Sequence, residues 1–461
     1  DWGTNPSLRK GTKVLTTEGI FPIDELEGKT FLVKNLNGEI SQARCWLSGK
    51  DKLLYEITLR GGKKYYATKE HEWPVWDGEK FIKVSSSEVE EGSLLPIIRQ
   101  DSLFDGSLGD YEDGFVAGWQ LGDGWLTQRS DNNCMQHGFI VSKKDAEYNI
   151  DKRIENYLSL LGSNARFSDR GSTLELNTVA NVLNENHNKF GCAHKSKGLP
   201  TTVWSECSEA FRKGIIDGLF SSDGHIEKGK KRINLTSKHK KLVEDVADLL
   251  GFYGIKSSVR KGYSKLKGKS FKRYDLRITE GASLRQFRKL FKLSVGYKQE
   301  RLNAYTFPYN INKNFIEVIS VKKTKLKEDV WDISVHDKTH CFQISQCITG
   351  NCCEIGLRPF QFCNLTTVNV SDVKTQEELE SRVKSAAFIG TLQASYTNFH
   401  YLRDVWSRTT EKDALIGVSM TGICSGKVLN LDLKAAAKVV KEENERVAKL
   451  IGINKAARAT C

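Results

Sequence analysis

Several features that define common protein classes are missing from this sequence. No apolar run approaches the roughly 20 residues that a helix needs to span a bilayer, and residues 1–6 lack the apolar core of a signal peptide. The 11 cysteines, an odd number, form neither a regular framework nor two CxxC pairs, so we expect free thiols and no disulfide or zinc site. These absences predict a cytoplasmic protein that does not bind a membrane.

Acidic residues are also in short supply. The chain has 57 Asp and Glu residues against 70 Lys and Arg residues, which gives a net charge of +13 and a pI near 9.0. Because basic side chains release condensed counterions when they contact phosphates, this balance favours a polyanionic partner such as nucleic acid. The 39% hydrophobic content excludes wholesale disorder, and 461 residues suffice for two to four domains.

The β-rich pattern of residues 11–98 stops and then returns much later in the chain. Two hairpins are expected in the first stretch, one about Asn-Gly at 37–38, which suits a type I′ turn, and one about Gly-Gly at 61–62. β character reappears at 315–348. We interpret the two stretches as one all-β domain with an insert.

The insert and the C-terminal part have different patterns. Helices mixed with strands are predicted from about 103 to 305, where basic clusters also appear. After Cys352 the pattern changes to long amphipathic helices, expected at 375–403 and 433–450. The sequence therefore predicts a multidomain chain, in which an all-β domain is interrupted by an α/β domain and followed by a mainly helical segment.

The α/β insert repeats itself. Residues 116–124 are echoed by residues 216–224, and a strand-like stretch and a helix follow each copy. Each copy has small residues four positions apart, namely Gly118 and Gly122, and Gly218 and Ser222. Two copies predict a domain with internal pseudo-twofold symmetry, which matches the near-twofold backbone of duplex DNA and lets a monomer bind it.

Both copies end in an acidic residue, Asp123 and Asp223. Small residues at i and i+4 let two helices approach almost backbone to backbone, so the two carboxylates are expected to emerge side by side. Such a pair in a basic groove suits shared divalent metal ions, which activate water and stabilise the charge on a cleaved phosphodiester. We expect Mg²⁺ at Asp123 and Asp223.

The two copies resemble the motif of the LAGLIDADG homing endonucleases. The resemblance implies site-specific cleavage of double-stranded DNA, with Lys197 holding or polarising a phosphate. A DNA-binding module with an inactive nuclease is the alternative. Further basic residues are expected to face phosphates and groove edges: Lys228, Lys230, Lys231, Arg232, Lys238, Lys240, Lys241, Lys261, Lys265, Lys267, Lys269, Lys272 and Arg273.

The flanking β segments contain a second series of motifs. Ser7 precedes a Gly-Thr strand, Thr68-x-x-His71 follows, and Trp-Asp-Ile at 331–333, His-Cys-Phe at 340–342 and Gly-Asn-Cys at 350–352 complete the series. In this order the motifs resemble the splicing domain of inteins, which share the Hint fold with hedgehog autoprocessing domains. The catalytic residues that the resemblance implies are Ser7, Thr68, His71, Asp332, His340, Asn351 and Cys352.

The resemblance implies a self-catalysed reaction that begins at Ser7. Its hydroxyl attacks the carbonyl of Pro6 in an N→O acyl shift, while His71 and Thr68 polarise or twist that bond and protonate the departing nitrogen. Cys352 then attacks the ester. The remaining steps are cyclisation of Asn351, assisted by His340 and Asp332, and a spontaneous shift to an amide.

Two positions depart from the intein pattern. Ser7 stands where Cys is usual, so the first step is expected to be slow, and Gly350 stands where His is usual, which leaves Asn351 to depend on His340. A splicing-blocked precursor is therefore an alternative. Hedgehog-like autoprocessing lacks support, because Asn351-Cys352 would then have no purpose.

When Pro6 is joined to Cys352, the sequence resembles the Asn-x-Cys-x-Glu active-site loop of ribonucleotide reductases. The resemblance implies a radical cysteine at Cys352, a general base at Glu354 and a hydrogen-bonding Asn5. Cys363 matches one of the reducing cysteines of the adenosylcobalamin-dependent class. That cofactor would serve the full-length host only, since the flanking pieces are too short for a reductase barrel.

These patterns predict five segments. They are a host fragment at 1–6, the splicing domain at 7–98 and 311–351, the homing endonuclease at 99–310, and a second host fragment at 352–461.

Overall fold

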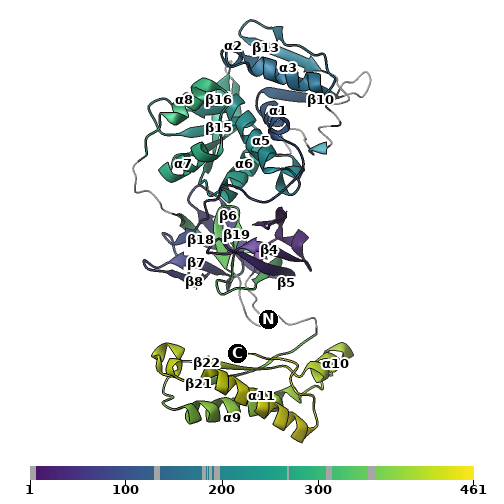
Figure 1. The fold of residues 1–461 in the computed structure, drawn as a ribbon, viewed down its shortest axis with the longest axis vertical. Coiled ribbons are helices and arrows are strands. Elements are labelled where there is room, and N and C mark those ends of the chain that lie inside the picture. Colours follow the sequence, from purple (N-terminus) through teal and green to yellow (C-terminus); the bar gives the residue numbers. More distant parts are fainter. Residues whose placement is uncertain are drawn as a thin grey trace. The chain divides into compact units, whose positions relative to one another are not determined.

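The computed structural model describes residues 7–128, 135–178, 183, 185, 189–191, 198–266, 269–307, 314–350 and 360–460. The chain divides into two compact units, Asp1–Cys352 and Cys353–Cys461. The first unit contains a β module, built from residues 7–98 and 314–350, and a duplicated module, built from residues 99–307 (Figure 1). None of the described helices is long and apolar enough to cross a membrane.

Two long strands join the two sequence segments of the β module. β5 (Ile40–Leu59) and β18 (Phe315–Val335) pair antiparallel along most of their length, although the duplicated module separates them in sequence. The six-stranded sheet has the order β4-β5-β6-β1-β18-β9, with β5 also paired to β18, and a four-stranded sheet has the order β20-β19-β2-β3. The β module is therefore one folded body made from both ends of the first unit.

The other β-module elements are short. They are β1 (Leu8–Arg9), β2 (Lys13–Leu15), β3 (Ile20–Pro22), η1 (Ile23–Leu26), β4 (Thr30–Lys34), β6 (Lys64–Ala67), β7 (Glu72–Trp76), β8 (Phe81–Ser85), β9 (Leu94–Pro96), β19 (Cys341–Ile344) and β20 (Cys347–Gly350). Both predicted hairpins are present, β4–β5 with Gly38 at φ +82° and β5–β6 with Gly61 at +114° and Gly62 at +92°. These positive φ angles favour glycine.

The duplicated module consists of two similar halves. The first contains α1 (Tyr111–Asp123), β10 (Gly124–Gln128), β11 (Met135–Ser142), α2 (Lys143–Ala146), α3 (Ile150–Leu160), β12 (Ser168–Asp169) and β13 (Thr173–Thr178). The second contains η3 (Thr201–Trp204), α5 (Glu209–Ser222), β14 (Gly224–Ile226), β15 (Ile233–Ser237), α6 (Lys240–Phe252), β16 (Ser258–Leu266), β17 (Lys269–Ile278), α7 (Gly281–Leu290) and α8 (Gly296–Asn303). The sheet orders correspond: β10-β11-β13-β12 and β14-β15-β17-β16.

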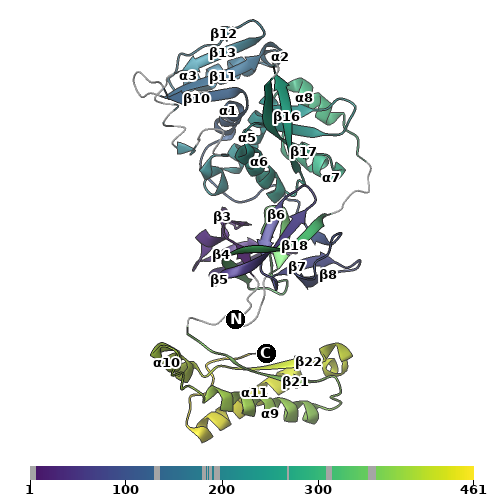
Figure 2. The same cartoon turned by 180° about the vertical axis from the view of Figure 1, so that it is seen from behind.

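The helices α1 and α5 lie between the two sheets and touch backbone to backbone (Figures 1 and 2). A Cβ atom added to Gly118 would lie 2.3 Å from the Ile215 carbonyl oxygen, and one added to Gly218 would lie 2.2 Å from that of Phe115. The predicted close approach is confirmed. Gly114 and Gly214 extend it by one further turn, at 2.2 Å from opposing carbonyl oxygens.

The second unit combines helices with a parallel sheet. Strands β21 (Asn364–Asn369), β22 (Ile416–Thr421) and β23 (Ala459–Thr460) pair in parallel, with α9 (Gln376–Ala394), α10 (Asp404–Asp413), two 3-10 turns, η4 (Ile423–Ser425) and η5 (Lys427–Asn430), and α11 (Leu433–Ile451) between them. Helices form most of the regular structure of this unit, as predicted, but the prediction omitted this sheet. Its first strand, Asn-Leu-Thr-Thr-Val-Asn, is too polar for a strand of a parallel sheet to be recognised from sequence.

Candidate active sites

Ser7 and Thr68 meet at the start of the β module. The backbone N–H of Ser7 donates to Thr68 Oγ1 at 3.0 Å, and the N–H of Thr68 donates to the Ser7 carbonyl at 2.9 Å. Leu8 fixes this position, because β1 pairs it with Ala67 on one side and with Trp331 on the other. Ser7 is fully buried. The structure therefore brings the predicted nucleophile to the predicted Thr-x-x-His motif.

His71 is buried beside the last strand of the β module. Its backbone N–H donates to the Thr68 carbonyl at 3.3 Å, and its Nε2 lies 2.6 Å from Thr349 Oγ1 on β20. Nδ1 has no hydrogen-bond partner among the residues that the structure describes. Burial, followed by the charge of Lys83, lowers the pKa of His71 to about 3. The imidazole is neutral at physiological pH, with one nitrogen available.

Asp332 and His340 occupy different environments. The Asp332 carboxyl is buried in β18, where burial raises its pKa well above the usual range. His340 is half-buried at φ +48°, and its Nδ1 lies 3.1 Å from the Val335 carbonyl oxygen. Its backbone N–H donates to Asp337 Oδ1 at 3.1 Å. A turn anchored by Asp337 thus positions His340.

The presence of glycine at position 350 has a steric explanation. It pairs with Cys341 at the end of β20, and an added Cβ would lie 2.8 Å from the Glu72 carbonyl oxygen on β7. A His at this position would push against backbone, which accounts for the departure from the intein pattern. Asn5, Lys197, Asn351, Cys352 and Glu354 lie outside the described residues.

The carboxylates of the second site stand at equivalent helix ends. Asp123 is the last residue of α1, and Asp223 is the C-cap of α5. The helices are so close there that a Cβ on Gly122 would lie 3.4 Å from the Asp223 nitrogen. Among the described residues no three His, Cys, Asp or Glu side chains form a metal-binding group. A shared Mg²⁺ would thus depend on water and phosphate oxygens for its remaining ligands, a coordination that this cation favours.

Lys298 lies beside this acidic pair and was not predicted. Its ammonium is buried and donates to the carbonyls of Ser221 at 2.5 Å and Ser222 at 2.7 Å, at the end of α5. Burial lowers its pKa, while Asp145, Asp123 and Asp223 oppose the shift. Both acidic residues therefore lie within electrostatic range of one cation. No motif marks this lysine, because it is brought in by α8 from a distant part of the sequence.

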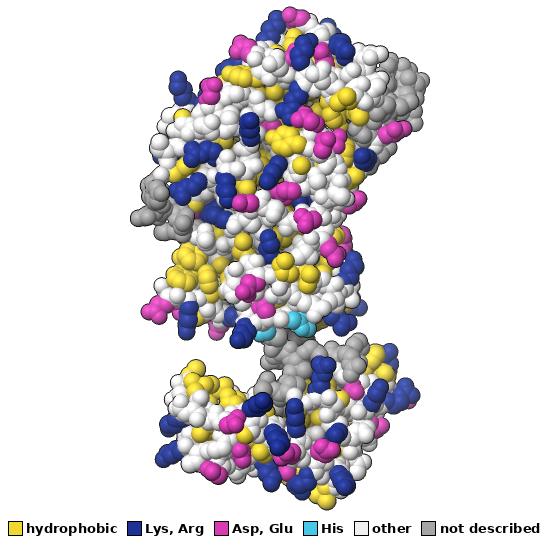
Figure 3. Space-filling model, viewed as in Figure 1, with side chains coloured by type: hydrophobic (Ala, Val, Ile, Leu, Met, Phe, Trp, Pro, Cys, Tyr) yellow, Lys and Arg dark blue, Asp and Glu magenta, His cyan; other side chains and the backbone are white. Residues whose placement is uncertain are grey.

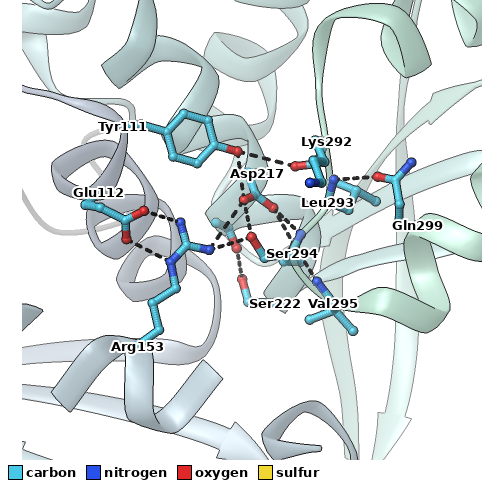
Figure 4. A network of polar contacts seen from close by, with 12 residues as sticks. Tyr111, Glu112, Arg153, Asp217, Ser222, Lys292, Leu293, Ser294, Val295 and Gln299 are labelled. Atoms are coloured by element: carbon cyan, nitrogen blue, oxygen red, sulfur yellow. Dashed lines mark hydrogen bonds and ion pairs between the residues drawn. The ribbon is translucent and has the colours of Figure 1, made fainter. Parts of the chain in front are cut away.

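A polar network holds α5 in place (Figure 4). Buried Asp217 accepts hydrogen bonds from Tyr111 Oη at 2.9 Å and from the backbone N–H of Ser294 at 2.7 Å. Arg153 forms a bidentate pair with Glu112 at 2.7 and 2.6 Å and also donates to Ser294 Oγ. The network joins both halves of the duplicated module and the segment before α8, so it fixes the helix that ends at Asp223.

A hollow of about 340 Å³ opens beside Asp223. It is lined by Asp223, Thr236, Ser237, Lys238, His239, Ser264, Phe271, Lys272 and Arg273. Lys238, Lys272 and Arg273 belong to the predicted basic set, and Lys and Arg side chains are spread over the duplicated module (Figure 3). The Asp223 carboxylate alone would repel an anionic ligand. The three cations around the hollow would attract it.

Cys363 lies in the second unit, directly before β21. It is half-buried, and burial raises the pKa of its thiol. The described cysteines are free thiols, as predicted; they are Cys45, Cys207, Cys341, Cys347, Cys363 and Cys424.

Comparisons with known proteins identify part of the duplicated module. Residues 210–292, which run from α5 to just beyond α7, match the LAGLIDADG-like domain family. A curated relative, the DNA-directed RNA polymerase subunit Rpo1C of Methanocaldococcus jannaschii, is 22% identical over 320 residues. The match covers 60% of this chain and 35% of the relative, so the chain spans about a third of that relative's length.

Similar solved structures fall into two groups. The homing endonuclease I-WcaI bound to its DNA recognition sequence shares 17% identity, covers 42% of this chain and 87% of its own, and gives a TM-score of 0.29. The PabCDC21-1 intein shares 20% identity over 20% of this chain and 73% of its own, at a TM-score of 0.18. The gp41-1 intein shares 25% identity, covers 20% of this chain and 70% of its own, and gives a TM-score of 0.17.

Proposed function

We propose that the β module catalyses its own excision by protein splicing in the cytoplasm. The observation that carries this proposal is the contact chain Ser7–Thr68–His71–Thr349, which links the start of β1 to the end of β20. Ser7 and Thr349, near the two described ends of the module, are thereby connected through one buried polar cluster. A fold that served stability alone would have no need of a buried neutral imidazole with a nitrogen that no described residue contacts.

The chemistry follows from the residues. The Ser7 hydroxyl attacks the carbonyl carbon of Pro6, and the Ser7 nitrogen leaves as an amine that is protonated from the side of Thr68 and His71. Cys352 takes the acyl group from the ester, and Asn351 then attacks its own peptide carbonyl to release residues 7–351. His340, whose backbone N–H donates to Asp337, would assist that last step.

Intact mass of the purified chain tests this proposal. We expect an excised product of residues 7–351 and a ligated product in which Pro6 is joined to Cys352. A Ser7→Ala variant should give no ligated product, and a Ser7→Cys variant should splice faster, since a thiol ionises more readily than a hydroxyl. Only intact precursor in all three would contradict the proposal and support the splicing-blocked alternative.

We further propose that the duplicated module cleaves double-stranded DNA as a pseudo-twofold monomer. Support comes from the LAGLIDADG-like match and from Asp123 and Asp223 at adjoining helix ends. Mg²⁺ held by this pair would activate water and neutralise charge on the phosphodiester. Lys238, Lys272 and Arg273 would hold the backbone beside Asp223, and Lys197 would hold or polarise a phosphate.

The substrate for the test is a plasmid that encodes residues 1–6 joined directly to residues 352–461. We expect a double-strand cut at the junction with Mg²⁺, none with EDTA, and none from an Asp223→Asn variant. A mobility shift without cleavage would support the alternative of a binding module with an inactive nuclease. Absence of both would contradict the proposal.

We infer that the flanking segments derive from a ribonucleotide reductase of the adenosylcobalamin-dependent class. The support is the joined loop with Asn5, Cys352 and Glu354, and Cys363 downstream. The parallel strands β21, β22 and β23 with intervening helices suit a β/α barrel. The full-length host, expressed without residues 7–351, should reduce ribonucleotides with adenosylcobalamin and lose this activity in a Cys352→Ala variant; absence of activity in the parent would overturn the assignment.

A further inference from the structure

We propose that Ser48 is a catalytic residue that takes up the proton of the Ser7 hydroxyl during the acyl shift. The proposal rests on the splicing function proposed above. Ser48 belongs to none of the motifs in the sequence. Its Oγ lies 2.5 Å from Ser7 Oγ, the atom that would attack the Pro6 carbonyl.

A β-bulge places Ser48 at this position. In the pairing of β5 with β18, Gly49 faces Val330 and Leu47 faces Trp331, so Ser48 is an extra residue between two successive pairs. Bulges of this kind redirect a side chain and are frequent beside active sites. On its other edge β18 pairs Trp331 with Leu8, the neighbour of Ser7. The bulge therefore directs the Ser48 hydroxyl to the nucleophile.

The position of Ser48 suits a proton relay. Ser7 is fully buried, whereas Ser48 is half-buried and has access to solvent. Thr68 contacts the backbone nitrogen of Ser7, and the His71 imidazole is hydrogen-bonded to Thr349. Of these three side chains, Ser48 is the one whose contact is with the attacking oxygen.

The proposed step is balanced. As the bond from Ser7 Oγ to the Pro6 carbonyl carbon forms, the Oγ proton passes to Ser48 Oγ, and the Ser48 proton passes to a water molecule. The bond from that carbon to the Ser7 nitrogen breaks, and the nitrogen receives a proton from water through the Thr68 and His71 side. An amide and a hydroxyl become an ester and an amine, with no net gain or loss of protons.

The relay is needed because the nucleophile is a hydroxyl. A serine side chain has almost no ionised form at neutral pH, whereas a thiol ionises near pH 8.5 and is nucleophilic as the thiolate. Loss of Ser48 should therefore slow the shift at Ser7 and have little effect on a Ser7→Cys variant. A merely structural role would affect both backgrounds equally.

The experiment measures hydroxylamine cleavage before residue 7, in the full chain with Asn351→Ala and Cys352→Ala to block later steps. Because positioned proton transfer contributes about 10²-fold or more, we expect Ser48→Ala to slow cleavage at Ser7 at least about 10-fold. Ser48→Thr should recover most of the rate. In the Ser7→Cys background Ser48→Ala should change the rate less than about 2-fold. Thr58→Ala, a hydroxyl removed elsewhere on β5, is the matched control.

Two results would overturn the relay while leaving splicing intact: equal slowing in both backgrounds, or no slowing at Ser7. Cleavage by the Ser7→Cys chain but none by the parent would also overturn it, since Ser48 would then fail to activate Ser7. If neither chain is cleaved although both keep the melting temperature of the parent, the splicing function itself fails, and this proposal fails with it.

Discussion

Asp332 is a buried carboxyl whose ionisation the fold disfavours. Its Oδ1 accepts the backbone N–H of Ile333 at 2.8 Å, and Oδ2 has no partner among the described residues. Burial raises its pKa. A raised folded-state pKa contributes stability below the unfolded value, near 3.9, that is lost as pH rises.

Replacement of this carboxyl by a neutral amide is therefore expected to stabilise the folded chain at neutral pH. In a Ser7→Ala background that also carries Asn351→Ala, so that the precursor stays whole, Asp332→Asn should raise the melting temperature at pH 7 and give no gain below about pH 4. Thermal unfolding monitored by circular dichroism at both pH values measures this. An equal change at the two pH values would show that ionisation of Asp332 is not the cause.

Thr349 is expected to set the tautomer of His71. If its hydroxyl donates to Nε2, the ring proton resides on Nδ1, the nitrogen left without a described partner. Thr349→Val should slow hydroxylamine cleavage at Ser7 by about 10-fold or more, within the range for a misplaced general acid. The shift of the imidazole ¹⁵N resonances reports the tautomer. Thr349→Ser, which keeps the hydroxyl, should behave as the parent, and an unchanged rate in Thr349→Val would refute the role.

At the residue scale, sequence motifs located one part of the candidate site and missed another. The contact of Ser7 with Thr68, and that of Thr68 with His71, were predictable because these residues belong to motifs that stand in a recognisable order. Ser48, Thr349 and Lys298 were not, because each reaches its site through strand pairing or helix packing between distant segments. Neither the bulge at Ser48 nor the position of Lys298 is marked by a pattern in the neighbouring sequence.

The α1–α5 contact depends on glycine along one helix face. A Cβ at Gly118 would lie 2.3 Å from a backbone oxygen, which cannot move without separating the helices. Gly118→Ala should lower the free energy of unfolding by about 1–3 kcal/mol and abolish DNA cleavage. Gly390→Ala on α9 is the matched control: its Cβ would meet its first neighbour at 3.6 Å, so the higher helix propensity of alanine should stabilise by up to about 1 kcal/mol.

Urea unfolding of both variants, again in the background with Ser7→Ala and Asn351→Ala, measures the difference in free energy. Equal effects of the two substitutions would contradict the close-packing explanation for the repeated glycines.

At the element scale, periodicity predicted what is local. Glycine turns marked both hairpins of the β module, and the predicted helix at 433–450 corresponds to α11. The helix predicted at 375–403 ends at Ala394, because the segment that follows is rich in aromatic and turn-forming residues. The parallel sheet of the second unit was missed, since β21 contains few apolar residues and only Val368 in it is buried.

At the scale of the first unit, the two modules share a buried polar contact. Lys63 Nζ lies 2.5 Å from Asp248 Oδ1 on α6, and Lys13 Nζ lies 3.0 Å from Asp245 Oδ1 and 3.6 Å from Asp248 Oδ2. Gly251 packs so tightly that a Cβ there would lie 2.3 Å from the Ser345 carbonyl oxygen, just before β20. The insert thus supports the strand that leads to the proposed C-terminal splice junction. The sequence does not predict this contact, because lysine and aspartate residues usually lie on the protein surface.

Asp248 is the centre of this contact. Burial opposes its ionisation, but the charges of Lys63 and Lys13 outweigh burial and lower its pKa. A depressed pKa contributes stability above the unfolded value near 3.9 that is lost as pH falls. Removing one partner of a buried ion pair costs about 3–5 kcal/mol, because the remaining charge is left unpaired.

Asp248→Ala should therefore uncouple the modules. In the background with Ser7→Ala and Asn351→Ala we expect calorimetry at pH 7 to resolve an additional, lower transition that the parent lacks, and the difference from the parent to shrink towards pH 3 as Asp248 protonates. Glu244→Ala is the control, since its pair with Lys240 is exposed on the same helix and contributes only about 0–1 kcal/mol. In chains with Ser7 intact, Asp248→Ala should also slow release of the C-terminal segment. If the unfolding profile changes but this release does not, the contact supports folding alone, and the insert has no part in splicing.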